Sequence, residues 1–360
     1  MSCDLENAVR TRVLIVDDSA FMRTAIARMV ASERDMQVVG TACGARDALQ
    51  KIVSLDPDVV TLDVEMPGMD GLGVLRHIMT EFPRPVIMVS AATEKDAQTT
   101  FAALGAGAFD YVPKQLSPAS LEIGHIRTEL IAKIRSAAHS HQSRAARKSP
   151  QSISDSELSS PSPTPAIVAI GVSTGGPRAL EQILPRFPAN LPVPILIVQH
   201  MPAGFTRSFA QRLSTLSSIK VCEAAHRELI RPGVIYVAPA GLHMHVVSRL
   251  SDAKPVFNLN RRPEHAEHMP SVDVMMNSVA QVFGDRAVGV IMTGMGSDGL
   301  DGMTSIFREG GLTIGQDEAS CAVYGMPRAC AERGILRRVL SLPDIPSHIV
   351  HAVLRRRKPA

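Results

Sequence analysis

The chain has 360 residues, of which 45% are hydrophobic and 20% charged, and its formal net charge is +3. The length predicts two domains, and the small charge gives no indication of a nucleic-acid partner. No apolar run reaches the roughly 18 residues of a membrane span, the N-terminus lacks a secretory signal, and the five cysteines form no Cys-x-x-Cys pair, so we expect a cytoplasmic protein without membrane insertion, disulfide framework or zinc knuckle.

The first half of the chain alternates apolar runs with stretches of helical periodicity. The continuous apolar character of the runs is typical of parallel strands in a sheet that is covered on both faces. Five alternations of strand and helix predict a doubly wound (βα)5 domain of class α/β. The predicted strands are 12–16, 37–42, 59–62, 86–89 and 109–112, and the predicted helices are 21–30, 45–54, 72–79, 94–104 and about 120–138.

Polar residues follow four of these strands. Because the carboxyl ends of parallel strands meet at one edge of a sheet, we expect their side chains to lie close together. Three carboxylates there repel one another unless a cation such as Mg²⁺ lies among them, and a hydroxyl and an ammonium suit the oxygens of a phosphoryl group. Each aspartate alone would more often be a helix cap or a solvated loop residue. The residues are Asp17 and Asp18, Asp63, Ser90 and Lys114.

Residues 12–130 resemble a response-regulator receiver domain. The motifs that carry the resemblance are Val16-Asp17-Asp18-Ser19, the segment from Leu62 to Gly71, Ser90-Ala91 and Val112-Pro113-Lys114. The resemblance implies that Asp63 accepts phosphate from a histidine kinase, with Mg²⁺ held by Asp17, Asp18, Asp63 and the Val64 carbonyl. Tyr111 matches the aromatic position that reorients with phosphorylation in this family, and a merely buried aromatic ring is the alternative.

Residues 139–165 form the predicted linker. Nine serines and four prolines lie between Ser140 and Pro165, with almost no apolar residues. Such a composition cannot bury enough surface to offset its chain entropy, so it predicts a flexible tether between two folded domains. The basic end of the chain, 355–358, is interpreted as a solvated tail.

The second half, 166–354, begins with an apolar run, 167–170, that stops at a serine among glycines. Gly171, Gly175 and Gly176 permit positive φ or close backbone approach, and helical periodicity resumes at 179–184. Ser173 therefore lies at a strand-to-helix corner, the setting of a nucleophile elbow. A tight turn or a phosphate-binding loop is the alternative reading of the same residues.

Further buried strands follow, and two of them end in residues of catalytic type. The predicted strands are 193–198, 234–238, 241–247, 255–257, 287–292 and 312–315, with helices at 272–282 and about 303–309. His200 follows the first of these strands, and Asp298 lies in the glycine-rich turn after 287–292. A second α/β parallel sheet would bring Ser173, His200 and Asp298 to one edge.

Serine, histidine and aspartate at one edge are the material of a catalytic triad. The serine attacks a carbonyl, the histidine takes its proton, and the aspartate fixes the imidazole tautomer, while the Met295 N–H is the predicted oxyanion-hole donor. Taken singly, His200 would more often be an ordinary histidine and Asp298 a cap of the helix that follows it. His243, His245, His265 and His268 are a weak zinc pattern, because no carboxylate or cysteine set accompanies them.

Residues 166 to about 350 resemble the methylesterase domain of chemotaxis receptor-modification enzymes, the CheB family. The motifs are the 171–177 corner, Gln199-His200-Met201-Pro202, Pro270-Ser271-Val272-Asp273, the 292–299 turn, and 316–320 leading to 325–327. The resemblance implies that Ser173, His200 and Asp298 hydrolyse glutamyl methyl esters on chemoreceptors, releasing methanol, and that glutamine deamidation is open to the same chemistry. Met269 departs from the arginine expected before Pro270.

We expect a monomeric esterase that needs no cofactor and that phosphorylation of Asp63 activates, because the unmodified receiver covers the edge that bears Ser173. Two rival hypotheses are weaker. A DNA-binding output domain would be short and basic, whereas this half is long and strand-rich. A nucleotide-binding loop at 171–176 lacks a following Gly-Lys-Ser/Thr and the Gly-x-Gly-x-x-Gly pattern.

Overall fold

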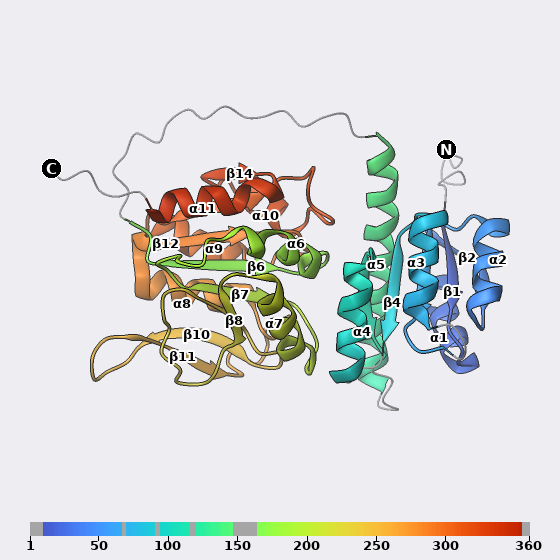
Figure 1. Cartoon of the computed structure of the whole chain (residues 1–360), viewed down its shortest axis with the longest axis horizontal. Coiled ribbons are helices and arrows are strands. Elements are labelled where there is room, and N and C mark those ends of the chain that lie inside the picture. Colours follow the sequence, from blue (N-terminus) through green and yellow to red (C-terminus); the bar gives the residue numbers. More distant parts are fainter. Residues whose placement is uncertain (1–9, 67–69, 91–93, 115–119, 147–163, 355–360) are drawn as a thin grey trace, which may run out of the picture. The chain divides into compact units, whose positions relative to one another are not determined.

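The computed structural model describes residues 10–66, 70–90, 94–114, 120–146 and 164–354, which fall into two compact units, Met1–Lys148 and Ser149–Ala360. Figure 1 labels their helices and strands. Several parts of the sequence predictions lie outside the described residues: 67–69 and Ala91 of the receiver motifs, 147–163 of the linker, and the basic tail at 355–358. Among the helices that are described, none combines the length and apolar character of a membrane span.

The first unit is the predicted doubly wound domain. Its five strands are parallel, in the order β2-β1-β3-β4-β5, and almost every residue of β1, β3, β4 and β5 is buried. Helices α1 and α5 share one hydrophobic cluster on one face of the sheet, and α2, α3 and α4 contact one another in series. The strands are β1 (Thr11–Val16), β2 (Met36–Ala42), β3 (Val59–Asp63), β4 (Val86–Ser90) and β5 (Asp110–Pro113). The helices are α1 (Ala20–Ala31), α2 (Ala45–Leu55), α3 (Gly71–Glu81), α4 (Glu94–Gly105) and α5 (Ser120–Ala146).

Helix α5 is longer than the sequence pattern predicts. It continues through residues 139–146, which the composition assigned to the linker, and ends at Ala146. These eight residues contain alanine, arginine and glutamine but no glycine or proline, and such residues extend a helix at little cost. The predicted start of the linker at residue 139 is therefore corrected: the helix continues to Ala146.

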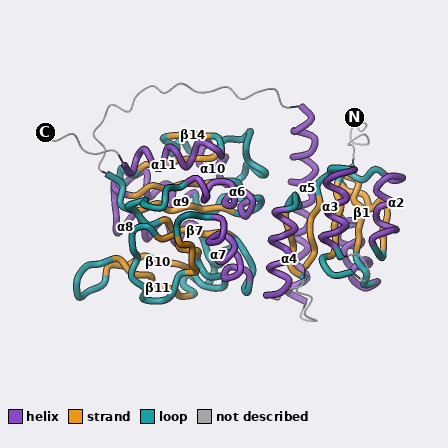
Figure 2. Tube along the Cα trace, viewed as in Figure 1, coloured by secondary structure: helices purple, strands orange, loops and turns teal. Residues whose placement is uncertain are grey.

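The second unit contains a seven-stranded sheet in which every pairing is parallel, in the order β14-β13-β12-β6-β7-β9-β8. The predicted strands at 241–247 and 255–257 do not join it but pair with each other as an antiparallel hairpin, β10 (His243–Ser248) with β11 (Pro255–Asn260). The sheet strands are β6 (Ile167–Val172), β7 (Ile195–Gln199), β8 (Lys220–Glu223), β9 (Val234–Val237), β12 (Ala287–Ile291), β13 (Leu312–Gln316) and β14 (Arg338–Leu340). Figure 2 distinguishes these strands from the helices around them.

Helices cover both faces of this sheet. Helices α8, α9 and α10 share one hydrophobic cluster with the hairpin, while α6 contacts α7 and the short helix η3, which α11 also contacts. The α-helices are α6 (Gly176–Ile183), α7 (Phe205–Leu216), α8 (Val272–Phe283), α9 (Leu300–Arg308), α10 (Met326–Glu332) and α11 (Ile345–Leu354). Single 3-10 turns are η1 (Leu184–Arg186), η2 (Gly284–Arg286) and η3 (Leu342–Asp344).

The register of the three central strands positions the candidate site. Val172 at the end of β6 pairs with Gln199 at the end of β7, and Gly171 pairs with Ile291 at the end of β12. Ser173 and His200 directly follow the two members of the first pair, and the loop that contains Asp298 leaves β12, the neighbouring strand. The expectation that all three residues leave one edge of one sheet agrees with this topology.

Candidate active site

Ser173 lies where β6 gives way to α6. Its backbone N–H donates to the Thr293 carbonyl at 3.0 Å, and its own carbonyl accepts from Gly176 at 2.8 Å. Gly175 is the N-cap of α6 with φ of 75°, a conformation that favours glycine. A Cβ atom on Gly294 would lie 2.9 Å from the Ser173 Cβ atom, so the backbone just before Met295 packs directly against the serine.

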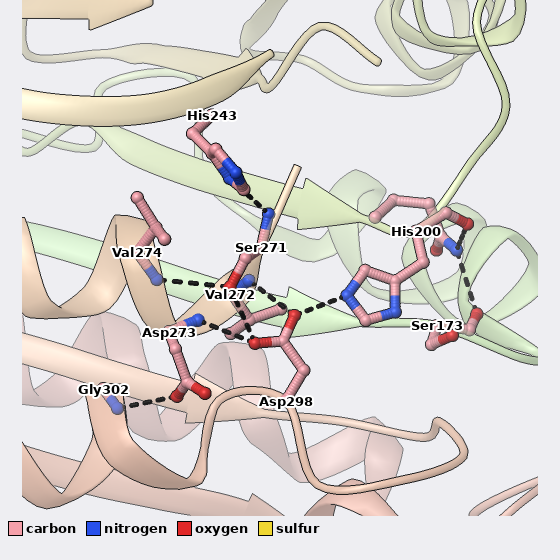
Figure 3. Close-up of polar contacts among 10 residues, drawn as sticks. Ser173, His200, His243, Ser271, Val272, Asp273, Val274, Asp298 and Gly302 are labelled. Carbon is pink, nitrogen blue, oxygen red and sulfur yellow. Dashed lines mark hydrogen bonds and ion pairs between the residues drawn. The ribbon is translucent and has the colours of Figure 1, made fainter. Parts of the chain in front are cut away.

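His200 is held so that its two ring nitrogens have different roles. Its backbone N–H donates to the Val172 carbonyl at 3.1 Å, and its Nε2 lies 2.7 Å from the Asp298 carboxylate. A carboxylate only accepts hydrogen bonds, so Nε2 carries a proton and the neutral ring keeps a lone pair on Nδ1. Nδ1 is buried without a hydrogen-bond partner among the described residues, and Figure 3 shows it on the side of the ring that faces Ser173.

Asp298 is the most heavily hydrogen-bonded residue of the site. Besides His200 Nε2, three groups at the start of α8 donate to its carboxylate: the Ser271 hydroxyl at 2.9 Å, the Val272 N–H at 2.8 Å and the Asp273 N–H at 3.0 Å (Figure 3). Burial raises the pKa of Asp298, but the hydrogen bond and charge of His200 and the α8 N–H groups outweigh it and hold the pKa well below its ordinary value. The carboxylate therefore stays ionised.

Asp298 does not cap the helix that follows it, which was the alternative role considered for this residue. The residue that caps the following helix α9 is Gly299, whereas Asp298 satisfies the N-terminus of α8, some 25 residues earlier in the chain. Asp273 of α8 reciprocates, since its carboxylate accepts from the Gly302 N–H of α9 at 2.8 Å. Burial raises the pKa of Asp273, and the neighbouring charge of Asp298 adds to the shift. The carboxylate just before α9 thus accepts hydrogen bonds from the N-terminus of α8, and a carboxylate of α8 accepts one from the N-terminus of α9.

Gln199 and Thr293 brace the loops that carry the serine and the histidine. The Gln199 amide donates to the carbonyls of Ser173 and His200, at 3.0 Å each, and the Thr293 hydroxyl donates to the Thr174 carbonyl at 3.0 Å. No role was predicted from the sequence for these two residues or for Ser271 and Asp273. Ser271 could have been predicted as the N-cap of α8, because a serine directly before a helical pattern is a preferred N-cap. Nothing in the sequence shows that its hydroxyl also donates to Asp298.

The histidines that suggested a weak zinc pattern serve the hairpin and the segment that leads to α8. His243 Nε2 lies 3.1 Å from the Pro263 carbonyl while its Nδ1 accepts the Ser271 N–H at 3.2 Å, and His245 Nε2 lies 2.9 Å from the Arg262 carbonyl. His265 is exposed, and His268 stacks on His200. Within the described ranges, the one group of potential metal ligands is in the first unit and contains no histidine. The Met269 carbonyl accepts from Gly241 at 3.1 Å, and no described contact explains methionine in place of arginine there.

In the first unit, Asp17, Asp18 and Asp63 gather at the edge of the sheet as expected, with ligand atoms within 4.8 Å of one another. Asp17 and Asp63 are buried and Asp18 is exposed. The Lys114 ammonium lies 2.6 Å from Asp63 Oδ2 and 3.0 Å from Asp17 Oδ2. Burial raises the pKa of Asp63 to about 6, against the opposing effect of Lys114, and the Asp17 charge contributes to the rise. Such a cluster of oxygen ligands fits a hard divalent ion.

Ser90 is the last residue of β4, which pairs with the Asp63 strand β3, and Tyr111 lies on β5, the next strand of the sheet. Both are buried, and the Thr100 hydroxyl of α4 donates to the Ser90 hydroxyl at 3.0 Å. The Lys133 ammonium of α5 donates to the Tyr111 carbonyl at 2.6 Å and lies 5.1 Å from the centre of the Tyr111 ring. The Val64 carbonyl, also expected as a metal ligand, accepts the Gly71 N–H at 3.0 Å. The reorientation of Tyr111 stays a prediction.

Comparisons with known proteins agree with the two-unit architecture. Residues 168–349 match the family described as CheB methylesterase, and residues 13–123 match the family described as response regulator receiver domain. A Pyrococcus abyssi protein named protein-glutamate methylesterase/protein-glutamine glutaminase is 45% identical over 347 residues, which cover 96% of this chain and 94% of that protein. A protein of the same name from Halalkalibacterium halodurans is 44% identical, covering 96% and 99%.

One solved structure supports the fold of the second unit. The crystal structure of the Thermotoga maritima CheB methylesterase catalytic domain is 38% identical to the matched part of this chain. It superposes with a TM-score of 0.50, covering 52% of this chain and 98% of that one. The similarity therefore extends over essentially the whole of that catalytic domain.

Proposed function

Because the chain belongs to the CheB methylesterase family and also carries a receiver domain, we propose that Ser173, His200 and Asp298 hydrolyse glutamyl methyl esters on chemoreceptors under the control of Asp63. The observation that supports this assignment most directly is the 2.7 Å contact of His200 Nε2 with an ionised Asp298, which leaves a buried Nδ1 lone pair on the side of Ser173. The protein is a phosphorylation-regulated chemoreceptor methylesterase.

The reaction follows from the tautomer of His200. The Ser173 hydroxyl attacks the ester carbonyl carbon while Nδ1 takes its proton, and the resulting imidazolium is stabilised by Asp298 through Nε2–H. When the tetrahedral intermediate collapses, the C–O bond to the methoxy group breaks and the proton on Nδ1 leaves with it as methanol. A water molecule, deprotonated at the same nitrogen, then attacks the acyl-enzyme and releases the glutamate carboxylate and the serine. A glutamine side chain would release ammonia by the same steps.

The Met295 N–H is the proposed donor to the oxyanion. The Ser173 N–H is engaged by the Thr293 carbonyl, while the Gly294–Met295 backbone packs against the serine. Met295→Pro removes this N–H, and we expect kcat to fall by about 10²- to 10³-fold. Met295→Ala keeps the N–H and is the matched control. Equal activities of the two variants would contradict the assignment.

In the receiver domain, Asp63 is the proposed phosphoryl acceptor. Asp17, Asp18 and Asp63 would hold Mg²⁺, which neutralises the charge of the transferring group, and Lys114 and Ser90 would contact its oxygens. The proposed phosphoryl donor is a histidine kinase, and the proposed substrate of the esterase is a methylated chemoreceptor. We further propose that the esterase needs no cofactor and that the protein acts as a cytoplasmic monomer.

The test is methanol release from methylated receptor, measured with the full chain in the presence and absence of a small phosphodonor and Mg²⁺. We expect the phosphodonor to raise the rate, and equal rates would exclude control by Asp63. Ser173→Ala should reduce kcat by about 10⁶-fold, as loss of a triad serine does. A Ser173→Ala enzyme with undiminished activity would exclude the proposed nucleophile.

A further inference from the structure

His268 lies against the catalytic histidine in a way that the reaction scheme does not use. The rings of His200 and His268 are stacked, with centroids 4.0 Å apart and planes inclined by 26°. His268 belongs to the segment 261–271 between β11 and α8, whereas His200 follows β7. The stack therefore joins two segments that meet only in the folded domain.

We propose that His268 is a positioning residue for His200, which fixes the plane of the catalytic ring. This inference rests on the proposed function, because it assumes that His200 is the general base. The hydrogen bond from Nε2 to Asp298 holds one end of the imidazole at 2.7 Å but leaves the ring free to tilt about that contact. A second ring against its face removes this freedom and keeps Nδ1 directed at Ser173.

The alignment of the ring matters most while the proton moves from Ser173 to Nδ1. The stack should therefore raise kcat rather than lower KM.

The segment that carries His268 is anchored independently of the stack. His243 and His245 of β10 contact the carbonyls of Pro263 and Arg262, and His243 also accepts the Ser271 N–H. Both ends of the segment are thus tied to the hairpin and to α8. His268 is presented to His200 from a held loop, which is what a positioning role requires.

The experiment compares His268→Ala, His268→Gln and His268→Phe in the full chain, with methylated receptor and a saturating phosphodonor. Phenylalanine retains an aromatic face, whereas alanine and glutamine do not. We expect about tenfold lower kcat with unchanged KM for the alanine and glutamine variants, and recovery to within about twofold of wild type for phenylalanine. His265→Ala, an exposed position of the same segment, is the matched control and should behave as wild type.

The outcomes separate this inference from the proposed function. Wild-type kcat in His268→Gln, a change confined to KM, or a phenylalanine variant as slow as the glutamine variant would each overturn the positioning role. Thermal unfolding of each variant identifies any that fail to fold, and the comparison of phenylalanine with glutamine decides the question even if the alanine variant does. If Ser173→Ala retained activity in the same assay, the triad assignment itself would be excluded.

Discussion

The two candidate sites of this chain both place a largely buried carboxylate at the carboxyl edge of a parallel sheet, yet they shift its pKa in opposite directions. Asp298 receives four donors, from His200, Ser271, Val272 and Asp273, and its pKa is held well below the ordinary value. Among the described residues, Asp63 receives the Lys114 ammonium and the Glu65 N–H, and burial raises its pKa to about 6.

The number of hydrogen-bond donors around a carboxylate thus decides which of two roles it suits. A carboxylate saturated with donors is a fixed charge that orients its neighbour, which is what a triad requires of its acid. A carboxylate left with few donors retains oxygen lone pairs for a cation and for a covalent bond.

Asp298→Asn should lower kcat for methanol release by about 10⁴-fold, because an amide no longer enforces protonation of His200 at Nε2. Steady-state kinetics with methylated receptor provide the measurement. Phosphorylation of Asp63 by a small phosphodonor should remain unchanged in this variant. An Asp298→Asn enzyme within tenfold of wild type would show that the carboxylate is not needed to select the tautomer.

Asp63→Asn should abolish phosphoryl uptake and therefore remove the whole of the rate increase caused by the phosphodonor. The amide cannot form the acyl phosphate, although it occupies nearly the same volume. Rates with and without phosphodonor are compared, with Asp56→Asn, an exposed aspartate of the same domain, as the control. Persistent activation of the Asp63→Asn chain would place the phosphorylation site elsewhere.

Ser271→Ala should have an intermediate effect, since it removes one of the four donors to Asp298 and the N-cap of α8. We expect a loss of about 10- to 100-fold in kcat, as for other residues that orient a catalytic group. Loss of the cap should lower the free energy of unfolding of this domain by about 1 kcal/mol. Denaturant unfolding and kinetics on the same preparation measure both, and Ser271→Thr, which keeps the hydroxyl, should restore them.

Asp273→Asn should have the smallest effect, and it should depend on pH. The raised pKa of Asp273 means that the folded chain holds this proton more tightly than the unfolded chain, so its contribution to stability is full below the ordinary value and is lost as pH rises through the folded pKa. The amide is neutral throughout and still accepts from Gly302, so the variant should gain stability relative to wild type as pH rises.

The measurement is the denaturant midpoint of wild type and variant between about pH 4 and pH 8. This range runs from the ordinary carboxyl pKa to just above neutrality. Asp285→Asn, at an exposed position of η2, is the matched control and should not reproduce the pH-dependent gain. A stability difference that shrinks with rising pH would mean that the sign of the Asp273 shift is wrong.

The strand ends could be predicted because parallel strands that are buried on both faces have uninterrupted apolar sequences. The first polar residue after each apolar run therefore marks the end of a strand. This is why the positions of Asp63, Ser173 and His200 at strand ends could be predicted. The partners of Asp298 were not predictable, because their donors are backbone N–H groups of another helix, and every residue has such a group. Nor does any pattern show that Nε2 rather than Nδ1 of His200 meets the carboxylate.

Some elements escaped prediction for simpler reasons. Strand β8 has four residues, lies at the edge of its sheet and begins with an exposed lysine, so it lacks the apolar run of a central strand. Helix α7 is capped by Gly204 with φ of 88°, without a side-chain cap. Helix α5 continues into a serine-rich stretch whose composition resembles a linker. The first helix-breaking residue of that stretch is Pro150.

The order of strands around β6 has a consequence for synthesis of the protein. The contact between His200 and Asp298 spans 98 residues of sequence, and β6 needs β12 as its neighbour on one side. A ribosome releases Ser173 and His200 long before Asp298, so a nascent or prematurely terminated chain holds the proposed nucleophile and base without the group proposed to orient them. The proposed triad is therefore complete only after translation has passed both β12 and the Asp298 turn.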